Sequence, residues 1–101
     1  MVVGRVDGTV VCSKQDKSLD GRSILVIQPV KIDTLESCGQ KLVALDPFGA
    51  GPGELVLVVG GSSARLAADF GNKVTVDQSI IAIIDNIDVE GRSCYRKGYS
   101  D

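Results

Sequence analysis

Histidine and tryptophan are absent from this chain of 101 residues, and its aromatic side chains are two tyrosines and two phenylalanines. The lack of histidine removes the commonest general base and the commonest zinc ligand together. The scarcity of aromatic rings leaves few platforms on which the bases of a single-stranded nucleic acid could stack. These absences weigh against histidine-dependent catalysis, a zinc site and recognition by base stacking.

Cysteine is also scarce. The three cysteines, Cys12, Cys38 and Cys94, are odd in number and show no CxxC spacing. This pattern disfavours a disulfide framework and a structural metal site, and it predicts reduced thiols. Apolar runs reach only about five residues, whereas a helix that spans a bilayer needs about 20. The opening letters, MVVGRVDG, do not fit a signal peptide. We therefore expect a soluble, intracellular protein without a membrane partner.

The charge balance gives no sign of a polyanionic partner. Eleven Lys and Arg residues face thirteen Asp and Glu residues, which leaves a net charge of −2. Nucleic-acid-binding domains usually carry a basic face, so no nucleic-acid partner is expected. Apolar residues make up 44% of the chain, which suits one packed core in one domain.

The apolar residues predict an all-β fold. Strands are predicted at residues 2–12, 23–31, 41–46, 54–59 and 79–89. One short helix is predicted after the fourth strand, because Ser62 or Ser63 can cap it and Gly71 with Asn72 ends it. Helices are too few to cover a parallel sheet. The expected fold is therefore all-β with one short helix, as a five-stranded, mostly antiparallel OB-like small β-barrel.

The chain is expected to divide into two segments. The barrel domain is expected to span residues 1–88, followed by a polar C-terminal tail at residues 89–101. Within the first strand, Gly4 and Gly8 predict a bend or a bulge, as in strands of small closed barrels.

A glycine-rich stretch follows the third strand. Residues 46–65 read DPFGAGPGELVLVVGGSSAR. A phosphate-binding loop would need a lysine or a following helix N-terminus, and here a strand follows instead. Two interpretations remain open. The stretch is a tight turn, or its small residues let several copies of the loop meet around a symmetry axis, away from the barrel core.

The last predicted strand is apolar on both faces. It begins SIIAIID, and strict alternation places Ile80, Ala82 and Ile84 on one face, with Ile81 and Ile83 on the other. A small barrel has one interior, so the outward set needs a second cover. The short helix or a neighbouring subunit could supply it.

Catalytic chemistry finds little support. Asp46, Asp77 and Asp85 lie near strand ends, but general acid–base catalysis needs a perturbed pair that the sequence does not identify. Ser62 and Ser63 have no histidine to activate them. No catalytic, cofactor-binding or metal-binding residue is assigned.

Four segments occur in the order of a known family. They are GTVV at residues 8–11, LVIQP at 25–29, LVALDPFGAGPGELVLVVGGSSAR at 42–65 and VDQSIIAIID at 76–85. The chain thereby resembles the pentameric vertex proteins of bacterial microcompartments, the carboxysome and ethanolamine-utilisation (CcmL/EutN) group. The resemblance extends to about residue 88, and the tail matches no motif.

The resemblance implies a structural role without enzymatic activity or cofactor. Such proteins form cyclic homopentamers that close the vertices of a microcompartment shell in the cytoplasm, beside hexameric shell proteins. A narrow pore follows the five-fold axis. Its implied lining residues are Gly49, Ala50, Gly51 and Gly53, and the implied subunit contacts are Arg65, Ile81, Ile83 and Asp85.

Two alternatives of another class remain. One is an OB-like barrel that binds single-stranded nucleic acid, and the other is a barrel that binds a small ligand. The mass in solution discriminates between the classes, because five copies support a shell protein.

Overall fold

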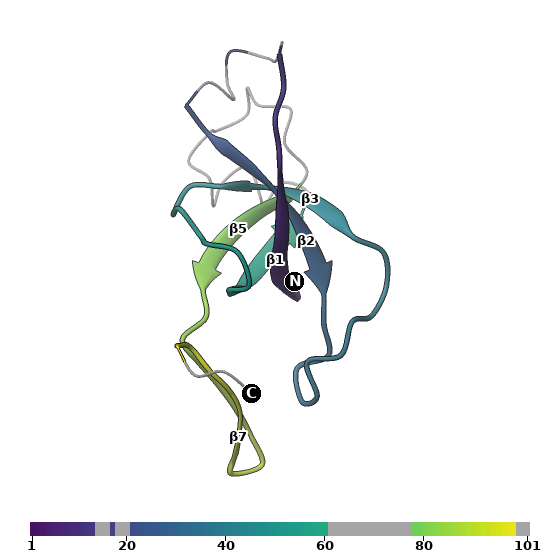
Figure 1. Cartoon of the computed structure of the whole chain (residues 1–101). Helices are drawn as coiled ribbons and strands as arrows, with labels where there is room; N and C mark the ends of the chain where they lie inside the picture. Colours follow the sequence, from purple (N-terminus) through teal and green to yellow (C-terminus); the bar gives the residue numbers. More distant parts are fainter. Residues whose placement is uncertain (14–16, 18–20, 61–77, 99–101) are drawn as a thin grey trace.

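The fold is described from a computed structural model, which describes residues 1–13, 17, 21–60 and 78–98. Five strands form a closed barrel, and a separate two-stranded hairpin follows it (Figure 1). The barrel strands are β1 (Val2–Val10), β2 (Ser23–Pro29), β3 (Leu42–Asp46), β4 (Leu55–Gly60) and β5 (Gln78–Ile83), and the hairpin strands are β6 (Asn86–Val89) and β7 (Arg92–Arg96).

The strands follow one another around the barrel in the order β1-β2-β3-β5-β4, and β4 pairs back to β1. Every neighbouring pair is antiparallel except β3 and β5, which run parallel at the Leu45–Ser79 pair. The predicted five-stranded, mostly antiparallel barrel is confirmed. The predicted helix lies outside the described residues, which contain no helix long and apolar enough to cross a membrane.

The barrel is filled by side chains from all five strands. Gly4 of β1 is buried against this core, at a point where an added Cβ would lie 2.2 Å from Ile27 Cγ2. The absence of a side chain at Gly4 therefore lets β1 approach β2 closely. The buried core residues are Val6, Leu25, Ile27, Ala44, Val56, Val58 and Ile80.

The bulge predicted in β1 is present. Val6 pairs with Ile27 and Gly8 pairs with Val26, so Asp7 is the extra residue between them. A bulge bends its strand and increases the local twist, which helps β1 to pair with β2 along its length and with β4 near its start.

A second bulge corrects the predicted faces of β5. Ile80 pairs with Val58, whereas Ala82 pairs with Leu57, so Ile81 is inserted between them. Ile83 consequently packs against the same core as Ile80. The prediction that Ile83 lies on the opposite face to Ile80 was wrong, because strict alternation fails where one strand carries an extra residue.

The predicted last strand, residues 79–89, is two strands. β5 ends at Ile83 and β6 begins at Asn86, with a bend at Asp85 between them. Glu90 and Gly91 join β6 to β7, and both have positive φ angles (51° and 79°), the combination typical of a tight hairpin turn. The predicted domain boundary after residue 88 falls inside β6. In Figure 1 the hairpin extends away from the barrel.

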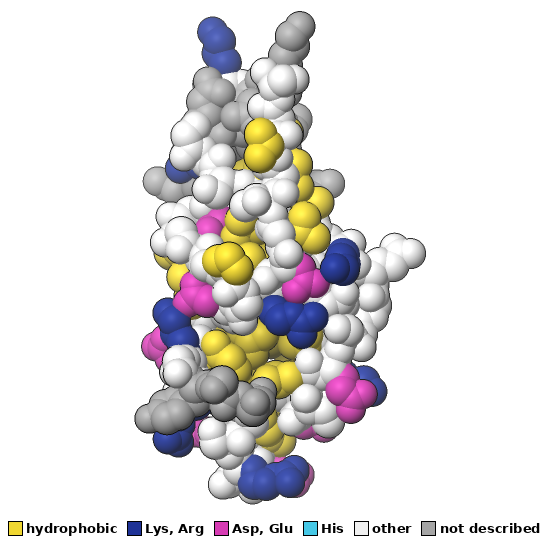
Figure 2. All heavy atoms as spheres, viewed as in Figure 1, with side chains coloured by type: hydrophobic (Ala, Val, Ile, Leu, Met, Phe, Trp, Pro, Cys, Tyr) yellow, Lys and Arg dark blue, Asp and Glu magenta, His cyan; other side chains and the backbone are white. Residues whose placement is uncertain are grey.

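The outer surface of the barrel also carries apolar side chains. Val3, Leu57 and Ala82 are cross-strand neighbours on β1, β4 and β5, and all three are half-buried. On β2 and β3, Val26 pairs with Val43, which is 51% exposed. Hydrophobic side chains gather in the middle of the face shown in Figure 2, with charged groups around them. We call Val3, Leu57 and Ala82 the outer stripe, and we call Val26 with Val43 the outer pair.

Candidate functional site

The glycine-rich stretch forms the connection between β3 and β4, and a buried carboxylate organises its first half. Asp46, the last residue of β3, is 5% exposed. Its side chain accepts hydrogen bonds from the backbone N–H groups of Phe48 (2.9 Å), Gly49 (3.1 Å) and Ala50 (2.6 Å). A buried carboxylate needs such donors to offset its lost hydration, and here the loop backbone supplies them.

A second carboxylate holds the other half of the loop. Glu54 Oε1 accepts the backbone N–H of Gly51. The loop is also joined to β1, because Gly53 N–H donates to the Val6 carbonyl and Val6 N–H donates to the Glu54 carbonyl, each at 2.9 Å. The loop is therefore a defined structure fixed at both ends.

Turn geometry accounts for two of the three glycines. Gly49 and Gly53 both have φ of 81°, a region that other residues enter only with strain. At Gly51 an added Cβ would lie 3.2 Å from Glu54 Oε1. Of the two interpretations of this stretch, the tight turn explains Gly49 and Gly53, and the symmetry-axis interpretation stays a proposal.

The four predicted pore-lining residues differ in their surroundings. Gly49 and Gly53 are exposed, with nothing within 4 Å of an added Cβ. Ala50, by contrast, packs against the core cluster of the barrel. The expectation that the core lies away from this loop was therefore wrong for Ala50. Pro52 is exposed in the middle of the loop.

Glu54 also links the loop to the C-terminal hairpin. Its Oε2 lies 2.8 Å from Lys97 Nζ, just after β7. The hydrogen bond from Lys97, followed by that from Gly51 N–H, lowers the pKa of Glu54, and the same ion pair raises the pKa of Lys97. Because the Glu54 pKa is lowered in the fold, its contribution to stability is present above the ordinary carboxyl pKa and is lost as the pH falls through the lowered value.

A second ionic cluster lies at the bulge of β1. The carboxylate of Asp7, the bulge residue, accepts hydrogen bonds from Arg5 Nε and Lys41 Nζ, each at 2.9 Å. These contacts, led by Lys41, lower the pKa of Asp7. The cluster ties the bulge of β1 to the residue before β3.

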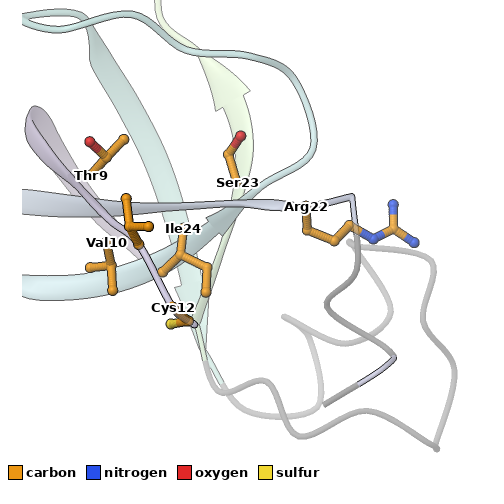
Figure 3. A pocket seen from close by; sticks show the side chains of 7 residues that line it. Thr9, Val10, Cys12, Arg22, Ser23 and Ile24 are labelled. Atoms are coloured by element: carbon orange, nitrogen blue, oxygen red, sulfur yellow. The ribbon is translucent and has the colours of Figure 1, made fainter. Parts of the chain in front are cut away.

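An open pocket of about 360 Å³ lies at the β1–β2 end of the barrel (Figure 3). Val10, Cys12 and Ile24 line it, and Arg22 extends outward from the other labelled side chains. None of the described residues that line it is a carboxylate or a histidine, so these residues form no acid–base pair.

Within the described part of the chain, no group of three or more metal-ligating side chains comes together. Cys12, Cys38 and Cys94 are free thiols. The Asp46 carboxylate accepts hydrogen bonds from three backbone N–H groups. These contacts give Asp46 a structural role in the loop and do not indicate a catalytic acid.

Three of the four predicted subunit-contact residues lie on β5 or just after it, and their surroundings differ. Ile81 occupies the β5 bulge and is half-buried, while Ile83 packs on the core. Asp85 is exposed, and its backbone carbonyl accepts Lys97 N–H at 2.7 Å. Arg65 lies outside the described residues.

Sequence reasoning missed the residues that shape the loop. Asp46 was considered only as a possible acid, and neither Glu54 nor Lys97 was assigned a role. A signal for Asp46 was available, because an Asp before a Pro- and Gly-containing segment favours side-chain bonding to nearby backbone N–H groups. Glu54 and Lys97 are far apart in the sequence, so no local sequence pattern indicates that they form an ion pair.

Comparisons with known proteins agree on one family. Residues 1–85 match the family described as "Ethanolamine utilisation protein EutN/carboxysome". The chain is 43% identical to the carboxysome shell vertex protein CcmL of Synechococcus elongatus, over 96% of each chain.

Solved structures give the same result. The structure of Gloeobacter violaceus CcmL aligns with a TM-score of 0.86 at 40% identity and covers 96% of this chain and 98% of its own. The GrpN pentameric microcompartment shell protein of Rhodospirillum rubrum aligns with a TM-score of 0.78 at 35% identity, covering 88% and 99%. The resemblance inferred from the four sequence segments is confirmed.

Proposed function

Because this chain belongs to the EutN/CcmL family, we propose that it is a structural shell protein whose homopentamers close the vertices of a bacterial microcompartment. The observation that carries the proposal is the 43% identity to a carboxysome shell vertex protein over 96% of both chains. The pentameric GrpN, with the same fold, supports the five-fold state. The protein acts without catalysis, metal or cofactor, and it resides in the shell within the cytoplasm.

The barrel surface suits self-association in a ring. A head-to-tail ring needs two different surfaces on each copy. The outer stripe lies on β1, β4 and β5, and the outer pair lies on β2 and β3, so the two apolar sets occupy different sides of the barrel. Fully burying an exposed Val or Leu side chain contributes about 1.5–3 kcal/mol, so the half-buried side chains of these sets would each contribute less. Arg65, Ile81 and Asp85 remain the proposed contact residues within this arrangement, whereas the side chain of Ile83 packs against the barrel core.

Hexameric shell proteins are the proposed outer partners, because a vertex must be bordered by the tiles of the facets. Nothing in the described residues favours the nucleic-acid alternative or a small-ligand site. Among the described residues, the polar side chains that line the open pocket between β1 and β2 are those of Thr9, Cys12, Arg22 and Ser23.

The purified protein is expected to be a closed pentamer at micromolar concentration. Native mass spectrometry should show five copies as the dominant species, and adding a single-stranded oligonucleotide should leave that mass unchanged. A spectrum holding only monomer or dimer would refute the proposal. A monomer that gains the mass of the oligonucleotide would instead support the nucleic-acid alternative.

The loop at residues 49–53 is the proposed lining of the pore on the five-fold axis. If so, Pro52→Glu places five carboxylates near one another, and their repulsion should destabilise the pentamer in low salt and fade as salt screens it. Pro52→Gln is the matched control, because it also removes the proline ring but adds no charge. Native mass spectra across a salt series measure the effect. Equal pentamer fractions for the two variants at every salt concentration would place the loop away from the axis.

A further inference from the structure

The Glu54 carboxylate contacts two separate parts of the molecule. Oε1 accepts the N–H of Gly51 in the glycine-rich loop, and Oε2 pairs with Lys97 Nζ at 2.8 Å just after the hairpin. The Glu54 side chain is 22% exposed and that of Lys97 44%. One side chain thus joins the loop between β3 and β4 to the end of the β6–β7 hairpin.

Lys97 is held at its backbone as well as at its ammonium group. Its N–H donates to the Asp85 carbonyl at 2.7 Å, which fixes the position from which the side chain reaches Glu54. A pair between two free surface side chains contributes little, largely because both must lose side-chain freedom. Here the backbone of Lys97 and one oxygen of Glu54 are already fixed, so less freedom remains to be lost.

The two contacts of Lys97 connect the hairpin to the rest of the molecule. β6 and β7 pair only with each other in the described structure, and an isolated two-stranded hairpin is marginally stable at best in water. The contacts of Lys97 with Asp85 and Glu54 therefore help to set how the hairpin is oriented on the barrel.

The two halves of the loop differ in what holds them. Asp46 binds the N–H groups of Phe48, Gly49 and Ala50 from the end of β3, with no contribution from the hairpin. Gly51 is bound instead by Glu54, whose other oxygen belongs to the hairpin contact. A change in the hairpin can therefore reach Gly51 without disturbing the three amides before it.

We propose that Glu54 couples the C-terminal hairpin to the glycine-rich loop, so that the hairpin sets the conformation of the loop around Gly51 while Asp46 keeps the preceding half fixed. The coupling is reciprocal, as any energetic coupling between two sites must be. A partner that binds the hairpin consequently alters the loop. This inference concerns the fold of one subunit and holds whether or not the loop lines a pore.

The test is amide hydrogen exchange followed by NMR on the full-length protein, because exchange reports local opening residue by residue. Lys97→Met keeps the aliphatic length of the side chain and removes its charge. We expect Gly51 to exchange about two- to fivefold faster, the range that partly exposed ion pairs support. The amides of Phe48, Gly49 and Ala50 should keep their wild-type rates. Lys41→Met is the matched control, because it removes a lysine from the ion pair with Asp7 and should leave Gly51 unchanged.

Further measurements complete the design. Lys97→Arg retains a cation and should keep Gly51 protected at near the wild-type level. If Lys97→Met does not fold, the wild-type protein is measured at low and high salt, where screening of the ion pair should accelerate exchange at Gly51 alone. An unchanged Gly51 rate on loss or screening of the ion pair would overturn the proposal. An equal acceleration of all four loop amides would also overturn it, because that result indicates general loosening of the loop.

Discussion

Gly4→Ala is expected to destabilise the barrel by about 1–3 kcal/mol, the range typical of overpacking in a dense core. The new Cβ would lie 2.2 Å from Ile27 Cγ2 and 3.2 Å from the Gln28 carbonyl oxygen. Ile27 is fully buried, and its β-branched side chain has few alternative rotamers. Either β1 must move away from β2 or Ile27 must leave its rotamer. Chemical denaturation followed by circular dichroism measures the change.

Gly8→Ala is the matched control for Gly4→Ala on the same strand. There an added Cβ would meet Val26 at 3.8 Å, an ordinary van der Waals contact. Glycine in a strand has a larger entropy loss on folding than alanine, so Gly8→Ala should leave the stability unchanged or raise it by up to about 1 kcal/mol. Equal losses for the two variants would show that strand propensity, and not the contact with Ile27, determines the result.

Asp46→Ala is expected to destabilise the protein by about 2–4 kcal/mol, because hydrogen bonds to charged groups contribute more than neutral ones and lost partners leave donors unsatisfied. Three backbone N–H groups would lose their acceptor. The loop should lose its order while the five strands persist. Denaturation measures the stability, and the amide resonances of Phe48, Gly49 and Ala50 report the loop.

Asp46→Asn separates the shape of the side chain from its acceptor oxygens. The asparagine amide keeps an oxygen at the position of Oδ1, which accepts hydrogen bonds from the N–H groups of Phe48 and Gly49. It places an NH₂ donor at the position of Oδ2, which accepts a hydrogen bond from Ala50 N–H. Its effect should therefore fall between those of wild type and Asp46→Ala. A stability for Asp46→Ala within about 0.5 kcal/mol of wild type, the range of an ordinary surface substitution, would show that the carboxylate does not organise the loop.

Local patterns predicted the first four barrel strands to within two residues at each end, because turn residues bound them. The fifth strand, predicted at residues 79–89, ends instead at Ile83. The two glycines of β1 indicated its bulge for the same local reason. The β5 bulge was not predictable, since nothing in the run of isoleucines shows that Ile81 is the extra residue. Its position follows from the register with Leu57 and Val58 on β4, which is set by packing across the sheet.

The candidate site shows the same division. The positive φ angles at Gly49 and Gly53 agree with the turn that the glycine-rich stretch predicted. The burial of Asp46 and the packing of Ala50 on the core depend on the closed barrel. The contact of Glu54 with Lys97 joins residues 43 positions apart (97 − 54), and no spacing rule relates them. Pore lining and subunit contacts involve more than one copy of the chain and stand as proposals.

Closure of the barrel also determines how the protein can meet another chain. Each barrel strand has a neighbour on both sides, so any open edge of the barrel is only a short segment. These segments arise because β3 pairs with β5 only at Leu45–Ser79 and β4 pairs with β1 only over Val2–Arg5. The hairpin also presents open sheet edges, and its strands are four and five residues long with a register shift between Ile87 and Asp88. Short, irregular edges are the devices by which β proteins resist edge-to-edge aggregation, and they leave this subunit suited to a finite assembly and poorly suited to a fibre.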